Sequence, residues 1–213
     1  PQNCVICDPG FRGIIHISEN ATVSDNQSCF YKSDLDGLQD IINVNVNSPG
    51  LEPIEIGHQT WDGGRITTLA LINANLSTLP KSIGELTRLN ILHLDNNALQ
   101  SLPESIGALA NLTELVLDEN QIKTLPETFG NLINLRGLSM DNNKLSTLPK
   151  NIGSLKNLRE LYLNYNEITS LPESFGDLEN LEILLIYYNS LTSLPQSIGN
   201  LNNLQVLYSS NNQ

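Results

Sequence analysis

The sequence is poor in the residues that most catalytic and metal sites require. Its 213 residues include three histidines (His16, His58 and His93), three cysteines, one tryptophan and one methionine. No G-x-S-x-G nucleophile motif, phosphate-binding loop, dinucleotide-binding glycine motif or H-E-x-x-H zinc motif occurs. The sequence therefore gives no support to catalysis, and we expect a non-enzyme with no cofactor and no metal centre.

Basic residues are also scarce. Eleven lysines and arginines stand against 23 aspartates and glutamates, which gives a formal charge of −12 and a pI of about 4.5. Such a chain repels nucleic acid and anionic membrane surfaces, so neither is expected as a partner. No apolar run approaches the roughly 20 residues of a transmembrane helix, so no membrane insertion is expected.

A motif that recurs every 23 residues dominates the rest of the chain. It reads L-x-x-L-x-L-x-x-N-x-L-x-x-L-P-x-x-I/F-G-x-L-x-N, with six full copies and a truncated seventh in residues 65–213. The copies open at Ile66, Leu89, Leu112, Leu135, Leu158, Leu181 and Leu204. Self-similarity at a fixed period of this length predicts a solenoid, in which each coil buries its leucines against the next.

Each part of the motif has a physical interpretation. The L-x-L segment places two leucines on one face of a short strand. The asparagine follows where the chain turns, and its amide can satisfy buried backbone groups. Leu-Pro fixes an extended backbone, so the returning segment should be extended or 3₁₀ rather than a long α-helix.

These repeats resemble those of the leucine-rich-repeat family, in particular its secreted or surface members from bacteria. The resemblance implies an α/β fold: a right-handed, arc-shaped solenoid with a parallel sheet on its concave side and an N-terminal cap. It also implies protein binding rather than catalysis. We expect a secreted or cell-surface protein, bacterial in origin.

Residues 1–64 lack the repeat and are expected to form the cap, as a short helix plus a hairpin. Residues 33–42 predict the helix, with Ser33 as N-cap and a stripe of Leu and Ile. Residues 54–61 and the strand that starts at Arg65 flank Asp62-Gly63-Gly64, which is a hairpin signal. Trp61 is expected to pack inside this cap.

All three cysteines fall in the cap, at Cys4, Cys7 and Cys29. Cys4-x-x-Cys7 is half of a zinc spacing, but no second cysteine pair or histidine pair follows it. A disulfide from Cys29 to Cys4 or Cys7 is the favoured interpretation, because a small loop-rich cap gains stability from a staple. Three reduced structural thiols are the alternative.

Function is expected on the outward positions of the strands. The second, third, fifth, seventh and eighth residues of each repeat are predicted to point away from the leucine core. Five of the six tyrosines occupy such positions in the last coils, and they form an aromatic patch with a leucine. The patch comprises Tyr162, Tyr165, Leu185, Tyr187, Tyr188 and Tyr208. Tyrosine is enriched at binding hot spots, so this patch is the predicted contact surface.

An acidic group precedes the aromatic patch along the stack. Asp95, Asp118 and Asp141 form one column, and His93 lies beside them. We predict a protein partner, basic in character, bound on the concave face. The alternative is a structural or adhesive surface array with calcium or glycan contacts, since carboxylates are preferred calcium ligands. The last coil stops at Gln213 without a polar cap, which predicts a continuing chain, a covering partner or self-association at this end.

Overall fold

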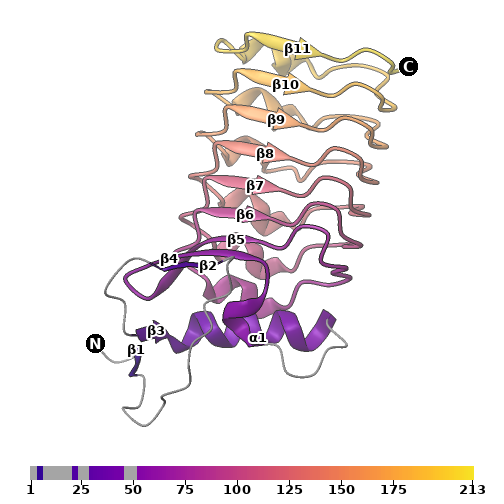
Figure 1. The fold of residues 1–213 in the computed structure, drawn as a ribbon. Helices are drawn as coiled ribbons and strands as arrows, with labels where there is room; N and C mark the ends of the chain where they lie inside the picture. Colours follow the sequence, from indigo (N-terminus) through magenta and orange to yellow (C-terminus); the bar gives the residue numbers. More distant parts are fainter. Residues whose placement is uncertain (1–3, 7–20, 24–28, 46–51) are drawn as a thin grey trace.

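The computed structural model describes residues 4–6, 21–23, 29–45 and 52–213, with side chains described at residues 30–45 and 52–213. Of the strands in the described ranges, all but β1 and β3 belong to one nine-stranded sheet in the order β11-β10-β9-β8-β7-β6-β5-β4-β2. The strands stack along one axis, with the N-terminal helix at one end of the stack and β11 at the other (Figure 1).

Each repeat contributes one short parallel strand. The strands are β5 (Arg65–Ala70), β6 (Ile91–His93), β7 (Glu114–Val116), β8 (Gly137–Ser139), β9 (Glu160–Tyr162), β10 (Ile183–Leu185) and β11 (Val206–Tyr208). Residues 23 apart pair directly, as in Leu92 with Leu115 and Leu115 with Leu138. The period therefore sets the register, and the predicted L-x-L strands are confirmed.

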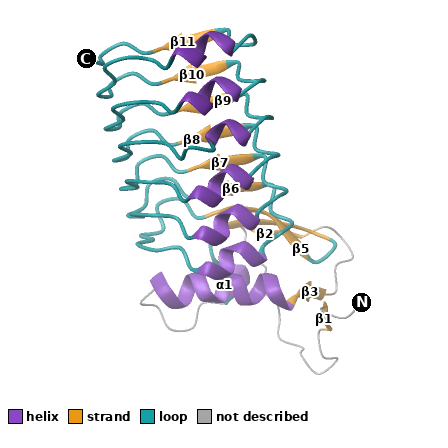
Figure 2. Ribbon diagram, turned by 180° about the vertical axis from the view of Figure 1, so that it is seen from behind, coloured by secondary structure: helices purple, strands orange, loops and turns teal. Residues whose placement is uncertain are grey.

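The returning segments form short 3₁₀ helices behind the sheet (Figure 2). They are η2 (Lys81–Glu85), η3 (Glu104–Ala108), η4 (Glu127–Asn131), η5 (Ile152–Ser154), η6 (Glu173–Asp177) and η7 (Gln196–Asn200). All but η5 start after a proline in extended conformation, such as Pro103 at φ −70° and ψ 152°. The prediction of 3₁₀ rather than long α-helical segments is confirmed.

One continuous hydrophobic core runs between the strands and the 3₁₀ helices, from Phe30 to Leu201. The central leucine of β6 to β10 is buried almost completely, at no more than 1% exposure. Burial of one such side chain contributes roughly 1.5–3 kcal/mol. No single coil encloses its own leucines, so stability comes from the stacking of neighbours.

The recurring asparagine is a structural ladder, as predicted. Asn120, only 7% exposed, accepts a hydrogen bond from the Leu99 N–H at 3.0 Å. Its amide group donates to the carbonyls of Leu94 at 2.9 Å and Leu117 at 3.1 Å. Each such asparagine thus satisfies backbone groups of two coils, where an unpaired buried group would cost roughly 1–3 kcal/mol.

The N-terminal helix α1 spans Lys32–Asn45, which is longer than the predicted 33–42. Ser33 is not its N-cap, because the helix has already begun at Lys32, and the hydroxyl instead contacts Asp34 at 3.2 Å. At the other end, the Asn45 side chain accepts from the N–H groups of Ser77 and Thr78 in the first coil. These tertiary bonds hold the last helical turn. The predicted apolar stripe is confirmed, with Leu38, Ile41 and Ile42 buried.

Asp34 links α1 to the first repeat through hydrogen bonds. It is fully buried and accepts from the Arg65 Nε at 3.0 Å and from the Ile66 N–H at 2.8 Å. A buried carboxylate is tolerated only with such complete pairing. Trp61 is buried too and meets Phe30 edge-on at 4.8 Å between ring centroids, which confirms its packing role.

The predicted hairpin is present. Strand β4 (His58–Asp62) pairs antiparallel with β5, and Gly63 and Gly64 turn between them at φ 54° and 78°. Strand β2 (Ala21–Val23) extends the same sheet beyond β4. The cap and repeats therefore share one sheet, and the boundary between residues 64 and 65 remains a prediction. No helix in the described ranges is long and apolar enough to cross a membrane.

The cysteine prediction concerns residues of which little is described. Cys7 lies outside the described residues, as do the side chains of Cys4 and Cys29. Strands β1 (Cys4–Ile6) and β3 (Cys29–Tyr31) pair antiparallel, with Cys29 opposite Ile6. A disulfide from Cys29 to Cys4 or Cys7 stays a prediction. Peptide mapping without reductant, on protein made under oxidising conditions, should find one such bond; three free thiols would contradict it.

Candidate functional site

The strands present one open face, called the sheet face below. The third and fifth residues of each repeat flank the buried central leucine, and stacked strands repeat about every 4.8 Å. The sheet face is therefore a grid of side chains whose columns are set by the 23-residue period. The aromatic and acidic residues singled out from the sequence lie on or beside it.

Three tyrosines form a contiguous group, the tyrosine cluster, just after strands β9 and β10. The rings of Tyr165 and Tyr188 stack, with centroids 4.8 Å apart and planes 9° apart. Tyr187 meets both edge-on, at 5.3 Å from Tyr165 and 5.7 Å from Tyr188. Tyr165 and Tyr188 are 45% and 48% exposed, which is high for large aromatic side chains.

The tyrosine cluster stands on an unusual backbone. The eighth residue of every repeat is left-handed, and the residues there are Asn73, Asn96, Glu119, Asn142, Tyr165, Tyr188 and Asn211. Asparagine tolerates this conformation better than other residues with a Cβ. Tyr165 and Tyr188 adopt it at φ 53° and 52°. For a bulky side chain this conformation costs about 1 kcal/mol or more.

The other residues of the predicted aromatic patch take no part in these ring contacts. Leu185 is half-buried in β10, and Tyr208 in β11 is 62% exposed. The Tyr162 hydroxyl donates to Glu160 at 2.8 Å. Partial burial, together with this bond to a carboxylate, raises the pKa of Tyr162 to about 12.

The acidic column differs from expectation. Asp118 accepts from the Asp141 N–H at 2.8 Å and the Ser139 hydroxyl at 2.6 Å. Asp141 accepts from the Asn164 N–H at 2.7 Å, and Asn164, 1% exposed, accepts from the Tyr187 N–H. The seventh residue of each repeat was predicted to point outward. That prediction is wrong for Asn164, which is buried, and only partly right for Asp118 and Asp141, which are half-buried. Asp118, Asp141 and Asn164 form a second ladder, in which each side chain accepts a backbone N–H from the next coil.

This ladder changes what the carboxylates can do. Burial raises the pKa of Asp141, while its hydrogen bonds from Asn164 act in the opposite direction. Among the described residues, the Asp95 carboxylate accepts no main-chain N–H, and its one donor is the Asn96 amide at 3.3 Å. In the described part of the chain, no three histidine, cysteine or acidic side chains converge as metal ligands. Carboxylates that accept backbone N–H groups have less capacity left for calcium.

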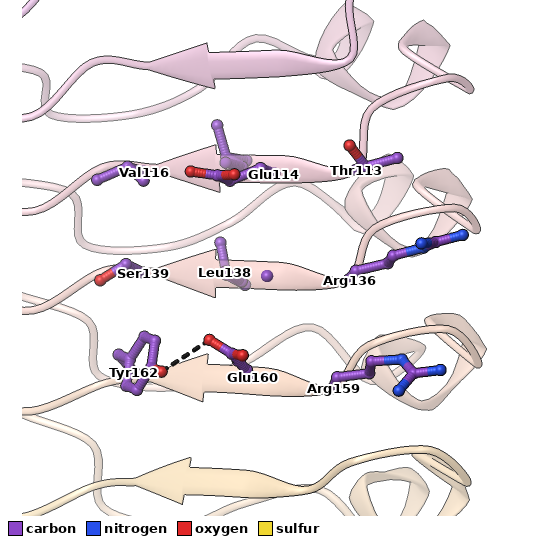
Figure 3. Close-up of a pocket in the computed structure, with 11 residues that line it drawn as sticks. Thr113, Glu114, Val116, Arg136, Leu138, Ser139, Arg159, Glu160 and Tyr162 are labelled. Atoms are coloured by element: carbon purple, nitrogen blue, oxygen red, sulfur yellow. Dashed lines mark hydrogen bonds between the residues drawn. The ribbon is translucent and has the colours of Figure 1, made fainter.

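A shallow depression of about 410 Å³ interrupts the sheet face around Gly137. Figure 3 shows Glu114 on one neighbouring strand and Glu160 on the other, with Val116, Ser139 and Tyr162 towards the strand ends. His93 contacts Glu114 at 2.7 Å, so the predicted site residue His93 reaches the rim of this depression. Sequence reasoning missed the depression, although a glycine between two glutamates in one column was its signal.

The repeats match a known family. Residues 65–142 and 126–213 fit the family model described as a leucine-rich repeat region. The chain therefore belongs to the leucine-rich-repeat family. The fold is its α/β solenoid with an open parallel sheet, and the family's fold typically serves binding rather than catalysis.

Solved structures support the same classification. A leucine-rich-repeat protein of Leptospira interrogans is 37% identical over 69% of this chain and 43% of its own, with a TM-score of 0.57. The ectodomain of the Arabidopsis thaliana receptor kinase GASSHO1/SCHENGEN3, in complex with Casparian strip integrity factor 2, is 27% identical over 69% and 18%, with a TM-score of 0.62. PEPR1 with AtPEP1 is 26% identical over 85% and 32%, with a TM-score of 0.62.

These comparisons define the class of the chain as a leucine-rich-repeat protein. The chain spans less than half the length of each of these three relatives. No curated protein matches it.

Proposed function

We propose that the chain is a non-catalytic module that binds a protein on the sheet face, with the tyrosine cluster as the main contact. The observation that carries this proposal is the stacked pair of Tyr165 and Tyr188. Both rings are about half exposed, and both stand on left-handed backbone where the repeat otherwise favours asparagine. Tyrosine costs stability at these two positions, where asparagine would cost less, and residues retained at such a cost often serve a function.

The chemistry of the cluster suits protein recognition. Tyrosine offers a large apolar surface and a polar tip for few torsions, so it loses little entropy when a partner covers it. The three rings already contact one another, so the surface is ordered before binding. Leu185, Tyr162 and Tyr208 would widen the contact. Asp95, Asp118 and Asp141 would supply the negative potential that attracts a basic partner.

The ligand-bound relatives make a protein or peptide partner reasonable. The plant ectodomain was solved with Casparian strip integrity factor 2, and PEPR1 with AtPEP1. We propose a secreted or cell-surface setting, in a bacterium, because the 37% identical relative is from Leptospira and the plant relative is an ectodomain. Surface labelling of intact source cells with a membrane-impermeant reagent would test that setting.

The binding proposal can be tested with a displayed library of random peptides selected on the purified chain. Peptides that bind the parent should bind Tyr165→Asn/Tyr188→Asn at least tenfold more weakly. The matched control is Ile133→Asn. Ile133 is 53% exposed and lies before strand β8, at the opposite end of the strands from the cluster. Equal binding to the parent and the double variant would contradict the proposal.

A further inference from the structure

The third residues of the repeats form one column of the sheet face, and one position in this column has no side chain. It runs Thr68, Ile91, Glu114, Gly137, Glu160, Ile183 and Val206, so a glycine separates two glutamates. A Cβ placed on Gly137 would meet no atom within 4 Å. The glutamates stand two strands apart, or roughly 10 Å at the usual strand spacing. The gap between them is therefore open to a group from outside.

Both glutamates that flank the gap are already oriented. One oxygen of Glu114 contacts the His93 Nε2 at 2.7 Å, and one oxygen of Glu160 accepts from the Tyr162 hydroxyl at 2.8 Å. The second oxygen of each carboxylate receives no hydrogen bond from the described residues. Each carboxylate thus keeps one acceptor for a ligand while a neighbour limits its rotation, which lowers the entropy lost on binding.

Two arginines also border the depression. Arg159 is paired with Glu182, with 2.8 Å between Nη1 and Oε1. Arg136 is exposed, and Figure 3 shows both arginine side chains extending away from the gap, beyond the start of their strands. Their charges therefore lie at the edge, whereas the glutamates face the gap from both sides. Partial burial is the main cause that raises the pKa of Tyr162 to about 12, and the negative charges of Glu160 and Asp141 add to it.

We propose that the gap over Gly137 receives a lysine or arginine side chain of the protein partner, a refinement that rests on the binding function proposed above. The cation would lie between Glu114 and Glu160 and use their second oxygens as charge-assisted acceptors. The aliphatic stem would pack beside Val116 and the Tyr162 ring, as long basic side chains do on apolar surface. The tyrosine cluster, one to two coils further along, would bind a neighbouring part of the same partner.

The test uses peptides selected on the parent chain from the displayed random library. They should share a lysine or arginine at a fixed position. In titration calorimetry, replacement of that residue by norleucine should weaken binding to the parent at least tenfold. The same replacement in the peptide should hardly change its affinity for the Glu114→Gln/Glu160→Gln variant. The control is Glu104→Gln/Glu127→Gln, which removes two exposed carboxylates from η3 and η4 behind the sheet and should behave as the parent.

A second variant tests the gap itself. Gly137→Ile introduces the residue found at positions 91 and 183 of the same column, and a Cβ at Gly137 meets open space. It should fold, remain at least as stable as the parent, and lose the preference for a basic residue. Retention of that preference in either the Gly137 or the glutamate variant would overturn the proposal.

The possible outcomes distinguish the Gly137 site from the proposed binding function on which it rests. Selected peptides without a recurrent basic residue, yet dependent on Tyr165 and Tyr188, would overturn the Gly137 site and leave the binding function standing. Peptides insensitive to the tyrosines would overturn the binding surface. Failure to select any peptide from the library would count against both.

Discussion

The tyrosine cluster should be replaceable by the repeat's own asparagines at almost no cost to stability. Tyr165→Asn and Tyr188→Asn each place the residue preferred in left-handed backbone at φ 53° or 52°. Because asparagine avoids the cost that tyrosine has in this conformation, each change should raise the free energy of unfolding by about 1 kcal/mol. Each change also removes two of the three ring contacts in the cluster.

The magnitudes decide the outcome. Each ring contact contributes about 0.5 kcal/mol, the low end of the range for aromatic pairs, because the rings are half exposed. A single variant therefore gains about 1 kcal/mol and loses about 1 kcal/mol, so its free energy of unfolding should hardly change. The double variant loses the stack once, not twice. Its free energy of unfolding should therefore be about 0.5 kcal/mol higher than the sum of the two single changes predicts, which is the contribution of the stack.

Urea unfolding followed by far-UV circular dichroism measures these differences. Asn96→Tyr is the reverse control, because its neighbours in the eighth column are Asn73 and Glu119 and no ring can stack on it. It should lose about 1 kcal/mol. If Tyr165→Asn and Tyr188→Asn each destabilise by about 2 kcal/mol or more, the tyrosines belong to the core, and the argument from strain to function is refuted.

The two polar ladders and the half-buried carboxyl of Asp141 give further predictions. Asn120→Ala should destabilise by about 2–4 kcal/mol in urea unfolding, because backbone groups of two coils lose partners, whereas exposed Gln121→Ala should change little; near-equal effects would contradict the ladder. Asp118→Ala should cost about 1–2 kcal/mol more than Asp95→Ala, because only Asp118 accepts a main-chain N–H; reversal would count against it. Asp141 has a folded pKa above its ordinary 3.8, so its protonated form favours the fold, and stability should fall as pH rises from about 3.8 through the raised pKa; a side-chain NMR titration midpoint at or below 3.8 would contradict this.

The repeat itself was predictable because one physical pattern determines it. The L-x-L spacing, the asparagine and the Leu-Pro step act locally, and stacking repeats the same solution in each coil. Strand positions, register and the 3₁₀ returns follow from that pattern. The length of α1 did not follow, because its last turn is held by bonds from Asn45 to the first coil, which helix propensity does not contain.

The candidate site was predicted in part. Tyr165, Tyr187 and Tyr188 were expected on one surface, and the structure brings them into contact. The bonds from Asp118 and Asp141 to the next coil were missed because strand alternation was extended two residues past the strand end. The substitution of Asn164 in the same column was the available signal, since asparagine and aspartate can both accept a backbone N–H.

Mapping the bound surface by hydrogen exchange tests the central claim most directly. The experiment compares the free chain with the chain saturated by a selected peptide. Protection should concentrate at residues 160–165 and 183–188, in β9, β10 and the turns that carry the tyrosine cluster. Protection confined to the 3₁₀ helices behind the sheet, with these segments unchanged, would contradict binding on the sheet face.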